Sequence, residues 1–374
     1  VKVDSLRIGA AIHADDVATR GEAAITAVTS APALRSWLAS THADFWRHVE
    51  RGLRVERGRL SRSPHDQYTG RLVDKTLIEQ VERNISLRQW SATQLAEFGV
   101  CSFRFFASRL LKLQPFETPE EGMDQRQLGT LQHEILEKTY REITDRGLII
   151  QSEHAEEALA ILKGIAGEVL HYAPIKLRFR PSALWEKEKE IVLRRLIQLV
   201  KLDFSSDSPI SKKFPGERHT HQQETEFSNV SLDLDGEHIQ IRGVIDRMDR
   251  IGDRIVIIDY KSDSTKIPKE ETEKGRDFQM MVYLSAAQQL VEDVAGGMFW
   301  HVSDRKTSGD LSPDDPVIEA GKAHIRNMLV MGRNGLFFAK ANGMEESKCT
   351  RYCDFAQFCR VSVTNQGKVD HAAD

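Results

Sequence analysis

Two neighbouring segments decide the fold, namely HIQIRGVIDRMDR at residues 238–250 and RIVIIDYKS at residues 254–262. Apolar and polar residues alternate in the first segment, as they also do in ETEF and VSLDLDG just upstream, which is typical of half-buried strands. Gly252 and Asp253 form a hairpin-turn signal, and the apolar run of the second segment indicates a buried strand. The sequence therefore predicts a β-hairpin whose second strand lies inside the protein.

Helical patterns surround this hairpin. Ser91 begins a helix-start pattern, SATQLAEF, and we expect that helix to continue through Cys101 to Leu113. Helices flanking a small mixed sheet give an α/β or α+β fold class. Apolar spacing predicts further helices at about 32–58, 125–146, 153–172, 182–204, 276–293 and 317–333, a strand at GMFWHVS and a polar loop at 262–275.

Length and composition limit the possible classes of protein. The chain has 374 residues, of which 40% are hydrophobic and 29% charged, and this excludes a wholly disordered, collagen-like or coiled-coil chain. A net charge of −4 excludes a uniformly basic nucleic-acid coat but permits a local basic groove. No secretory signal and no apolar run of about 20 residues is evident, so we expect a cytoplasmic protein.

The turn-rich stretch SRSPHDQYTG at 61–70 indicates a connector. We therefore expect a helical N-terminal appendage at 1–88 and a main domain at 89–374. Because the chain starts at Val1, we expect it to be part of a longer protein.

Cysteine usage points to a metal. Three of the four cysteines fall within eleven residues near the C-terminus, and a reducing compartment favours a metal or iron–sulfur site over disulfides. The alternatives are a zinc site and buried free thiols. The four are Cys101, Cys349, Cys353 and Cys359.

The hairpin carries the strongest chemical signal. Two strands joined by a short turn bring Asp246 and Asp259 close together, and Lys261 leaves the same face of its strand as Asp259. Paired carboxylates suit Mg²⁺ or Mn²⁺, and a nearby lysine can orient water or stabilise charge on a phosphate. The alternative is a solvated surface hairpin, although an unpaired carboxylate after the buried run Val256–Ile258 would be costly.

These motifs resemble the PD-(D/E)xK nuclease superfamily, and more narrowly its RecB/AddB-type domain. The resemblance rests on GVIDR and IIDYKS, on Gln279 and Tyr283 of QMMVY, on WSATQLAEFGVCSFRFFA, and on GTLQHEILE at 129–137. It runs from about Trp90 to Arg360 and implies the restriction-endonuclease-like core of that superfamily.

The resemblance also implies roles for individual residues. Lys261 would be the catalytic lysine, and Gln279 and Tyr283 would shape the site beside the DNA backbone. The helical His133 would otherwise be explained as a partner of Glu134 or Glu137. The implied metal ligands are His133, Asp246, Asp259 and the Tyr260 carbonyl, with Glu137 as a possible support for the imidazole and Glu224 as an acidic residue of less certain role.

In AddB-like proteins an upstream cysteine and three C-terminal cysteines hold a [4Fe–4S] cluster, which implies the same for Cys101, Cys349, Cys353 and Cys359. The gap between Cys349 and Cys353 has three residues, where the family usually has two. Such a cluster would clasp the ends of the nuclease core.

The sequence therefore predicts a Mg²⁺- or Mn²⁺-dependent DNA nuclease of exonuclease type, acting on DNA ends in double-strand-break repair with a helicase–nuclease partner subunit. No Walker A loop is evident, so we expect no ATPase activity in this chain. The alternatives are a standalone exonuclease of the same superfamily and a non-catalytic DNA-end-binding iron–sulfur module.

Three further stretches are candidates for nucleic-acid contacts. The group Phe103–Phe106 can stack bases but is also typical of a helix core. Six arginines between Arg47 and Arg62, and the basic stretch Lys176–Arg180, are either phosphate contacts or solvated surface.

Overall fold

A computed structural model of the protein describes residues 17–29, 31–61, 63, 68–114, 122–291, 293–343, 349 and 353–359. The chain divides into two compact units, one of Leu72–Arg360 and one of the remaining residues. This division lies upstream of residue 88, where the sequence suggested a boundary. The difference arises because helix α4 (Lys75–Ser86) packs against α13 (Val317–Arg333) of the larger unit.

The smaller unit contains three helices. The sequence predicted one helix over 32–58, but this is wrong, because the chain leaves the helical conformation at His42 (φ −136°). The hydroxyl groups of Ser40 and Thr41 both donate to the Trp37 carbonyl, and such side-chain bonds compete with helix continuation. The helices are α1 (Arg20–Thr29), α2 (Ala33–Thr41) and α3 (Ala43–Leu60).

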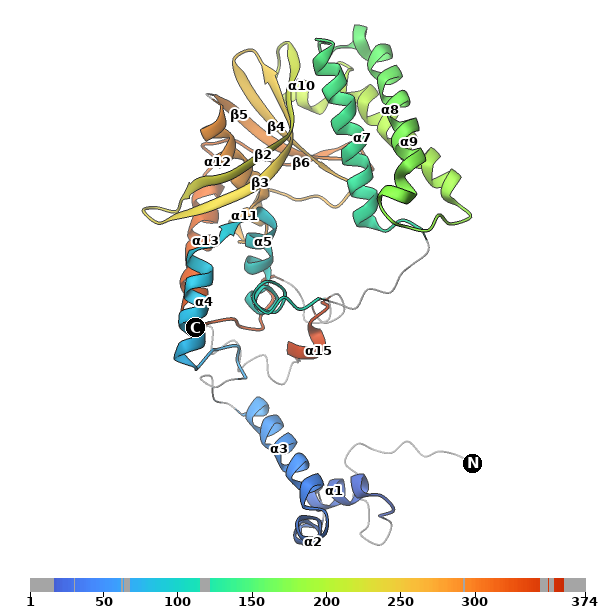
Figure 1. The fold of residues 1–374 in the computed structure, drawn as a ribbon. Helices are drawn as coiled ribbons and strands as arrows, with labels where there is room; N and C mark the ends of the chain where they lie inside the picture. The colour runs from blue at the N-terminus through green and yellow to red at the C-terminus, as the bar shows by residue number, and fades with distance from the viewer. Residues whose placement is uncertain are drawn as a thin grey trace. The chain divides into compact units, whose positions relative to one another are not determined.

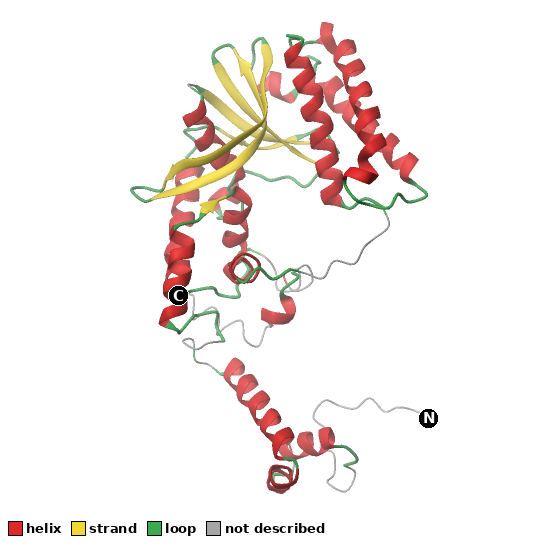
Figure 2. Cartoon of the chain, viewed as in Figure 1, coloured by secondary structure: helices red, strands yellow, loops and turns green. Residues whose placement is uncertain are grey.

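A mixed sheet forms the centre of the larger unit (Figures 1 and 2). Its strand order is β1-β3-β4-β5-β6, and β2 also pairs with β3. The predicted hairpin is confirmed as antiparallel β3–β4, with Arg247 opposite Ile258, and β5 runs parallel to β4. The strands are β1 (Gln89–Trp90), β2 (Arg218–Asp233), β3 (His238–Ile251), β4 (Arg254–Lys261), β5 (Val294–His301) and β6 (Thr307–Leu311).

Helices cover both faces of this sheet, which confirms the predicted fold class. Along β4, Ile255 and Ile257 pack into a core with α5, α12 and α13, whereas Val256 and Ile258 pack into a core with α7, α8 and α9. The side chains of successive strand residues point to opposite faces, so an apolar run is needed to fill both cores.

The remaining helices complete these layers (Figure 2). One segment, Ser152–Lys176, is long and apolar enough by composition to cross a membrane, but α8 buries eight of its side chains in this unit. The helices are α5 (Ala92–Val100), α6 (Ser102–Phe105), the π-helix η2 (Phe106–Leu110), α7 (Gln125–Asp145), the 3₁₀-helix η3 (Ser152–His154), α8 (Ala155–Lys176), α9 (Trp185–Asp203), α10 (Pro209–Lys213), α11 (Glu270–Glu273), α12 (Gln279–Leu290) and α15 (Ala356–Cys359).

One predicted helix is broken. The expected continuous helix from Ser91 to Leu113 ends at Val100, because Cys101 is extended (φ −161°, ψ 111°). A Cβ on Gly99 would lie 1.9 Å from the Gly275 carbonyl oxygen, so the end of α5 presses directly on another backbone. The chain therefore changes direction at Cys101 before α6 begins.

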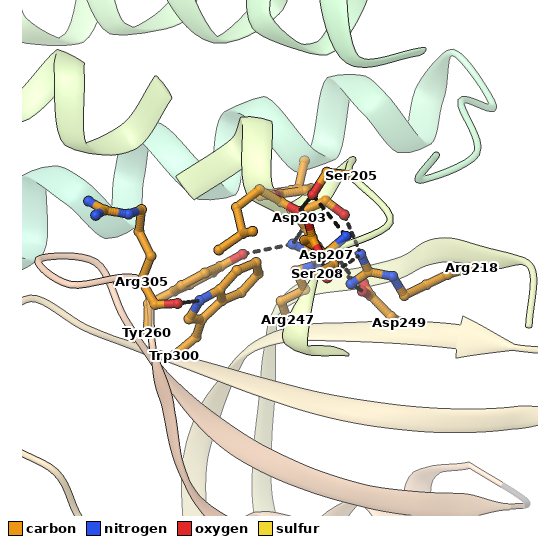
Figure 3. A network of polar contacts seen from close by, with 12 residues as sticks. Asp203, Ser205, Asp207, Ser208, Arg218, Arg247, Asp249, Tyr260, Trp300 and Arg305 are labelled. Carbon is orange, nitrogen blue, oxygen red and sulfur yellow. Dashed lines mark hydrogen bonds and ion pairs between the residues drawn. The ribbon is translucent and has the colours of Figure 1, made fainter. Parts of the chain in front are cut away.

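A buried polar network joins the helical layer to the sheet (Figure 3). Arg247 donates to Asp203 at 2.9 Å, to the Tyr260 hydroxyl at 2.8 Å and to both carboxylate oxygens of Asp249 at 2.6 and 2.7 Å. Arg218 pairs with the same two aspartates, and all four charged side chains are at most 1% exposed. Two buried positive and two buried negative charges thus compensate each other.

We expect Asp203→Asn to destabilise the protein by about 3 kcal/mol or more, because it leaves buried guanidinium charges uncompensated. Burial raises the Asp203 pKa, but Arg218 and Arg247 outweigh it and hold this pKa below its usual range. The stabilisation by this carboxylate is therefore full above its ordinary pKa and is lost as pH falls through the lowered value. Urea unfolding at pH 7 measures the effect. The control is Asp207→Asn, because Asp207 forms an exposed pair with Lys212 and its loss should leave the transition nearly unchanged. Equal midpoints for the two variants would contradict this account.

Candidate active site

Strands β3 and β4 bring two aspartates together. Arg247 lies opposite Ile258, so Asp246 and Asp259 are the next facing residues of the hairpin. The backbone N–H of Tyr260 donates a hydrogen bond of 2.8 Å to Asp246 Oδ2. Asp259 is only 2% exposed, whereas Asp246 is half-buried. The two carboxylates thus share one pocket that is closed on the Asp259 side.

Helix α7 delivers His133 to this pair. Its Nδ1 lies 3.4 Å from Asp246 Oδ2, and its Nε2 lies 2.9 Å from the Tyr260 carbonyl oxygen. Gly129, one turn earlier, permits the close approach, because a Cβ there would lie 3.2 Å from Ser262 Oγ. Both ring nitrogens face acceptors, so the doubly protonated ring satisfies both contacts.

The alternative partners of His133 are engaged elsewhere. Glu134 pairs with Lys138 at 2.8 Å and with Lys176 at 2.6 Å, and Glu137 pairs with Arg141 at 2.6 Å. In place of the expected support from Glu137, the imidazole meets the hairpin itself.

Glu224 on β2 joins the same cluster. One possible ligand atom from each of His133, Glu224 and Asp246 lies within 4.8 Å of the others. Glu224 has a φ of +47°, a left-handed conformation that residues with a side chain seldom adopt and that tends to occur at functional sites. Sequence reasoning assigned no firm role to this residue, and the acidic position upstream of the hairpin was its only signal.

Lys261 is held by two neighbours. Its Nζ lies 2.8 Å from Asp259 Oδ2 and donates to Gln279 Oε1 at 2.6 Å. The Gln279 amide nitrogen donates in turn to Asp259 Oδ1 at 2.8 Å and to the Tyr283 hydroxyl at 2.9 Å. Because Gln279 and Tyr283 are four residues apart on α12, they share one face of that helix. This chain of contacts fixes both the lysine and the aspartate.

The acidic groups resist ionisation. Burial, together with the charge of Asp246, raises the pKa of Asp259 to about 7 and that of Glu224 to about 7. Burial lowers the pKa of His133, but Asp246 and the other carboxylates outweigh it and raise this pKa to about 9. Concentrated negative charge therefore favours any cation that enters the site.

This donor set fits a divalent cation. Asp259 Oδ2 is buried and accepts no well-directed hydrogen bond, although the Lys261 ammonium lies close to it as an ion pair. Carboxylate and carbonyl oxygens, with one imidazole, are ligands that suit Mg²⁺ or Mn²⁺. The cluster opens into a cleft of about 490 Å³ that includes His133, Glu224 and Lys176.

Comparison with known proteins agrees with this geometry. A family model described as the PD-(D/E)XK nuclease superfamily matches residues 89–360. The chain belongs to this superfamily. The match contains every residue of the acidic cluster, and the resemblance that the sequence indicated is confirmed.

Curated relatives are similar over part of the chain. Proteins named as one subunit of an ATP-dependent helicase/deoxyribonuclease are 28% identical in Lactococcus lactis subsp. cremoris, over 53% of this chain, and 26% identical in Clostridium tetani, over 55%. The chain spans about a fifth of the length of these relatives, namely 17% and 18%. A solved structure from Eubacterium rectale covers 76% of this chain and 94% of its own, with 12% identity and a TM-score of 0.34, which is too low to support an argument.

The structure also brings the cysteines near one another. Cys101 is half-buried at the break between α5 and α6, and burial raises the pKa of its thiol to about 11. Cys349 and Cys353 contribute to the same increase through their charges, so they lie close to Cys101. Cys359 ends α15, where its Sγ donates to the Ala356 carbonyl at 3.6 Å. Residues 344–348 and 350–352, between and beside these cysteines, lie outside the described part of the chain.

The aromatic candidate for base stacking contributes mainly to the core. Phe105 is fully buried and stacks with Phe98 at 4.4 Å and with Trp90 at 5.5 Å between ring centroids. Phe106 packs against Phe337 at 4.8 Å. The alternative interpretation of this stretch as helix core therefore describes Phe105 and Phe106.

We expect Glu224→Gln to raise the melting temperature of the metal-free protein at pH 8 by about 2 °C. A folded-state pKa of about 7, above the ordinary value, means that the charged carboxylate destabilises the fold as pH rises through about 7. The gain should shrink at pH 5, where the wild-type group is largely protonated. Thermal unfolding in a chelator measures it, with the exposed Glu226→Gln on the same strand as control. A lower melting temperature at pH 8 would refute this explanation.

Proposed function

We propose that this chain is a Mg²⁺- or Mn²⁺-dependent deoxyribonuclease that hydrolyses phosphodiester bonds of DNA. The observation that carries the proposal is the convergence of His133, Glu224 and Asp246 beside the Asp259–Lys261 pair. Membership of a nuclease superfamily and relatives named as deoxyribonuclease subunits support it. His133, Glu224, Asp246, Asp259 and the Tyr260 carbonyl would hold the metal, which would polarise the phosphate and lower the pKa of a bound water.

In this proposal Lys261 acts as a cation. Burial lowers its pKa, but Asp259 outweighs burial and the pKa is raised, so the amine stays protonated at neutral pH. A protonated lysine cannot accept a proton from water. It can, however, stabilise the negative charge that develops on the phosphate oxygens. Asp259 and Gln279 hold the ammonium in place before substrate arrives, which avoids a reorganisation cost during reaction.

The wider setting follows from the relatives. We propose that the chain trims DNA ends as an exonuclease in double-strand-break repair and recombination, in the cytoplasm, together with a helicase–nuclease partner chain. The partner is part of this proposal because the curated relatives are named as subunits of a helicase/deoxyribonuclease. A standalone exonuclease would use the same cluster. A non-catalytic end-binding module is less favoured, because Lys261 is held in place by Asp259 and Gln279.

Cleavage of end-labelled DNA tests the proposal. We expect Asp259→Ala to abolish Mg²⁺-dependent cleavage and the rise in melting temperature on adding Mg²⁺. Lys261→Ala should lower the cleavage rate by at least about 100-fold, because charge stabilisation is lost, while retaining the Mg²⁺-induced rise. Asp253→Ala in the exposed turn and Lys266→Ala in the following loop are the matched controls. DNA binding without cleavage by the wild-type protein would instead favour the end-binding module.

We further propose that Cys101, Cys349, Cys353 and Cys359 hold a [4Fe–4S] cluster. The mutual proximity of Cys101, Cys349 and Cys353 supports a shared metal site, since 248 residues (349 − 101) separate the first two in sequence. Thiolates close together repel one another unless a metal neutralises them. A zinc ion with the same four ligands is the alternative.

Anaerobically purified protein should show a broad visible absorption band and contain iron. We expect Cys353→Ala to lose both and to lower the melting temperature, because the cluster ties chain segments together. The exposed neighbour provides the control, since Asp354→Asn should change neither property. Bound zinc without iron would establish the zinc alternative, and the absence of both metals would exclude a metal at these cysteines.

A further inference from the structure

Three arginines gather at one end of the strand that carries Asp246. Arg88 precedes β1, Arg109 lies in η2 and Arg242 lies on β3. The half-buried guanidinium of Arg88 lies 5.5 Å from the ring centre of Trp90 and 5.4 Å from that of Phe105. These rings are at the core and hold the arginine in place, so its planar group is pre-organised for a ligand.

The cluster has more positive charge than its neighbours neutralise. Within the described ranges, no carboxylate pairs with Arg88 or Arg242, and Arg88 Nε is buried without a hydrogen-bond partner. Arg88 Nη2 donates only to the neutral amide oxygen of Asn84, at 2.6 Å. Burial lowers the pKa of Arg88, and the charges of Arg109 and Arg242 lower it further. Glu97 compensates only the Arg109 side, at 2.6 Å.

The strand pairing places this cluster beside the acidic site. On the same side of β3, β1 pairs with Gln240 and Ile241, and β4 pairs with residues 247–251. The segment from Arg242 to Asp246 lies between these two partners and has only β2 as a paired strand in the described sheet. Both end residues alternate with the buried Ile241 and Ile245, and β3 is regular here, so about 13 Å of strand separates them.

We propose that Arg88, Arg109 and Arg242 form a second phosphate-binding site, which holds the DNA backbone a few nucleotides from the bond that is cut. This inference rests on the proposed nuclease function. A distance of about 13 Å corresponds to about four nucleotides at the 3.4 Å axial spacing of phosphates along one strand. Arginine donors match phosphate oxygens in geometry as well as charge. A bound phosphate would also relieve the repulsion among the three guanidinium groups.

Binding to fluorescent single-stranded DNA, measured by anisotropy in a chelator, tests the site without requiring cleavage. We expect Arg242→Gln to weaken binding at least threefold and to reduce the slope of log K against log salt by about 1. Arg250→Gln is the matched control, because Arg250 is also an exposed arginine on β3, four residues on the other side of Asp246. Circular dichroism verifies that both variants fold.

Strand length and backbone charge locate the contact. The effect of Arg242→Gln should vanish for a two-nucleotide strand and reach its full size by about eight nucleotides. A single neutral methylphosphonate linkage should weaken wild-type binding most at one position a few nucleotides from the cleavage point, and should not weaken Arg242→Gln binding there.

Each outcome is decisive for this site. Equal affinity and salt slope for wild type and Arg242→Gln would overturn the proposal, as would an equal loss in Arg250→Gln, which would indicate nonspecific attraction. Loss of binding in Arg242→Gln alone, in a protein that does not cleave DNA, would support the arginine site while refuting the nuclease function.

Discussion

The buried contact of Arg247 with Asp203, Asp249 and Tyr260 is the interaction on which the arrangement of the site depends. It connects the end of α9 to β3 and β4 through one guanidinium group. Tyr140 of α7 donates to the same Asp203 at 2.6 Å, and its ring lies 3.6 Å from the Arg247 guanidinium. Since Tyr140 is two turns beyond His133, the network that fixes the helical layer also fixes the position of the imidazole.

Neighbouring residues in the two strands divide the work. In Asp246-Arg247 and Asp259-Tyr260, alternation sends the aspartate to the acidic cluster and its neighbour to the buried network. The cluster is electrostatically unfavourable by itself, as the raised pKa values of Asp259 and Glu224 indicate. The network beside it is charge-compensated and can supply the rigidity that the cluster lacks. Functional sites commonly carry such strain, which the surrounding structure must offset.

The sequence predicted the hairpin correctly, because alternation, a turn signal and a buried apolar run agree there. The position of His133 followed only from the resemblance, since no local pattern states that a helix over 100 residues upstream meets the hairpin. Glu224 was uncertain because its role depends on a left-handed backbone conformation that no motif encodes. The Asp203 and Tyr140 contacts could not be predicted, since long-range pairs leave no periodic signal. The break at Cys101 was missed because it results from packing against Gly275, which is equally distant in sequence.

The open segment of β3 links the two ends of the proposed substrate path. A strand that is paired along its whole length offers no approach to its edge, whereas the exchange of β4 for β1 beside β3 leaves a gap from Arg242 to Asp246. Negative carboxylates lie at one end of this gap and positive guanidinium groups at the other. A polyanion held only by the arginines would be repelled by the carboxylates, so a bound divalent cation is needed to reverse the sign of that end. The same polarity would align a DNA strand along β3, because its backbone would reach the metal only after its neighbouring phosphates had found the arginines.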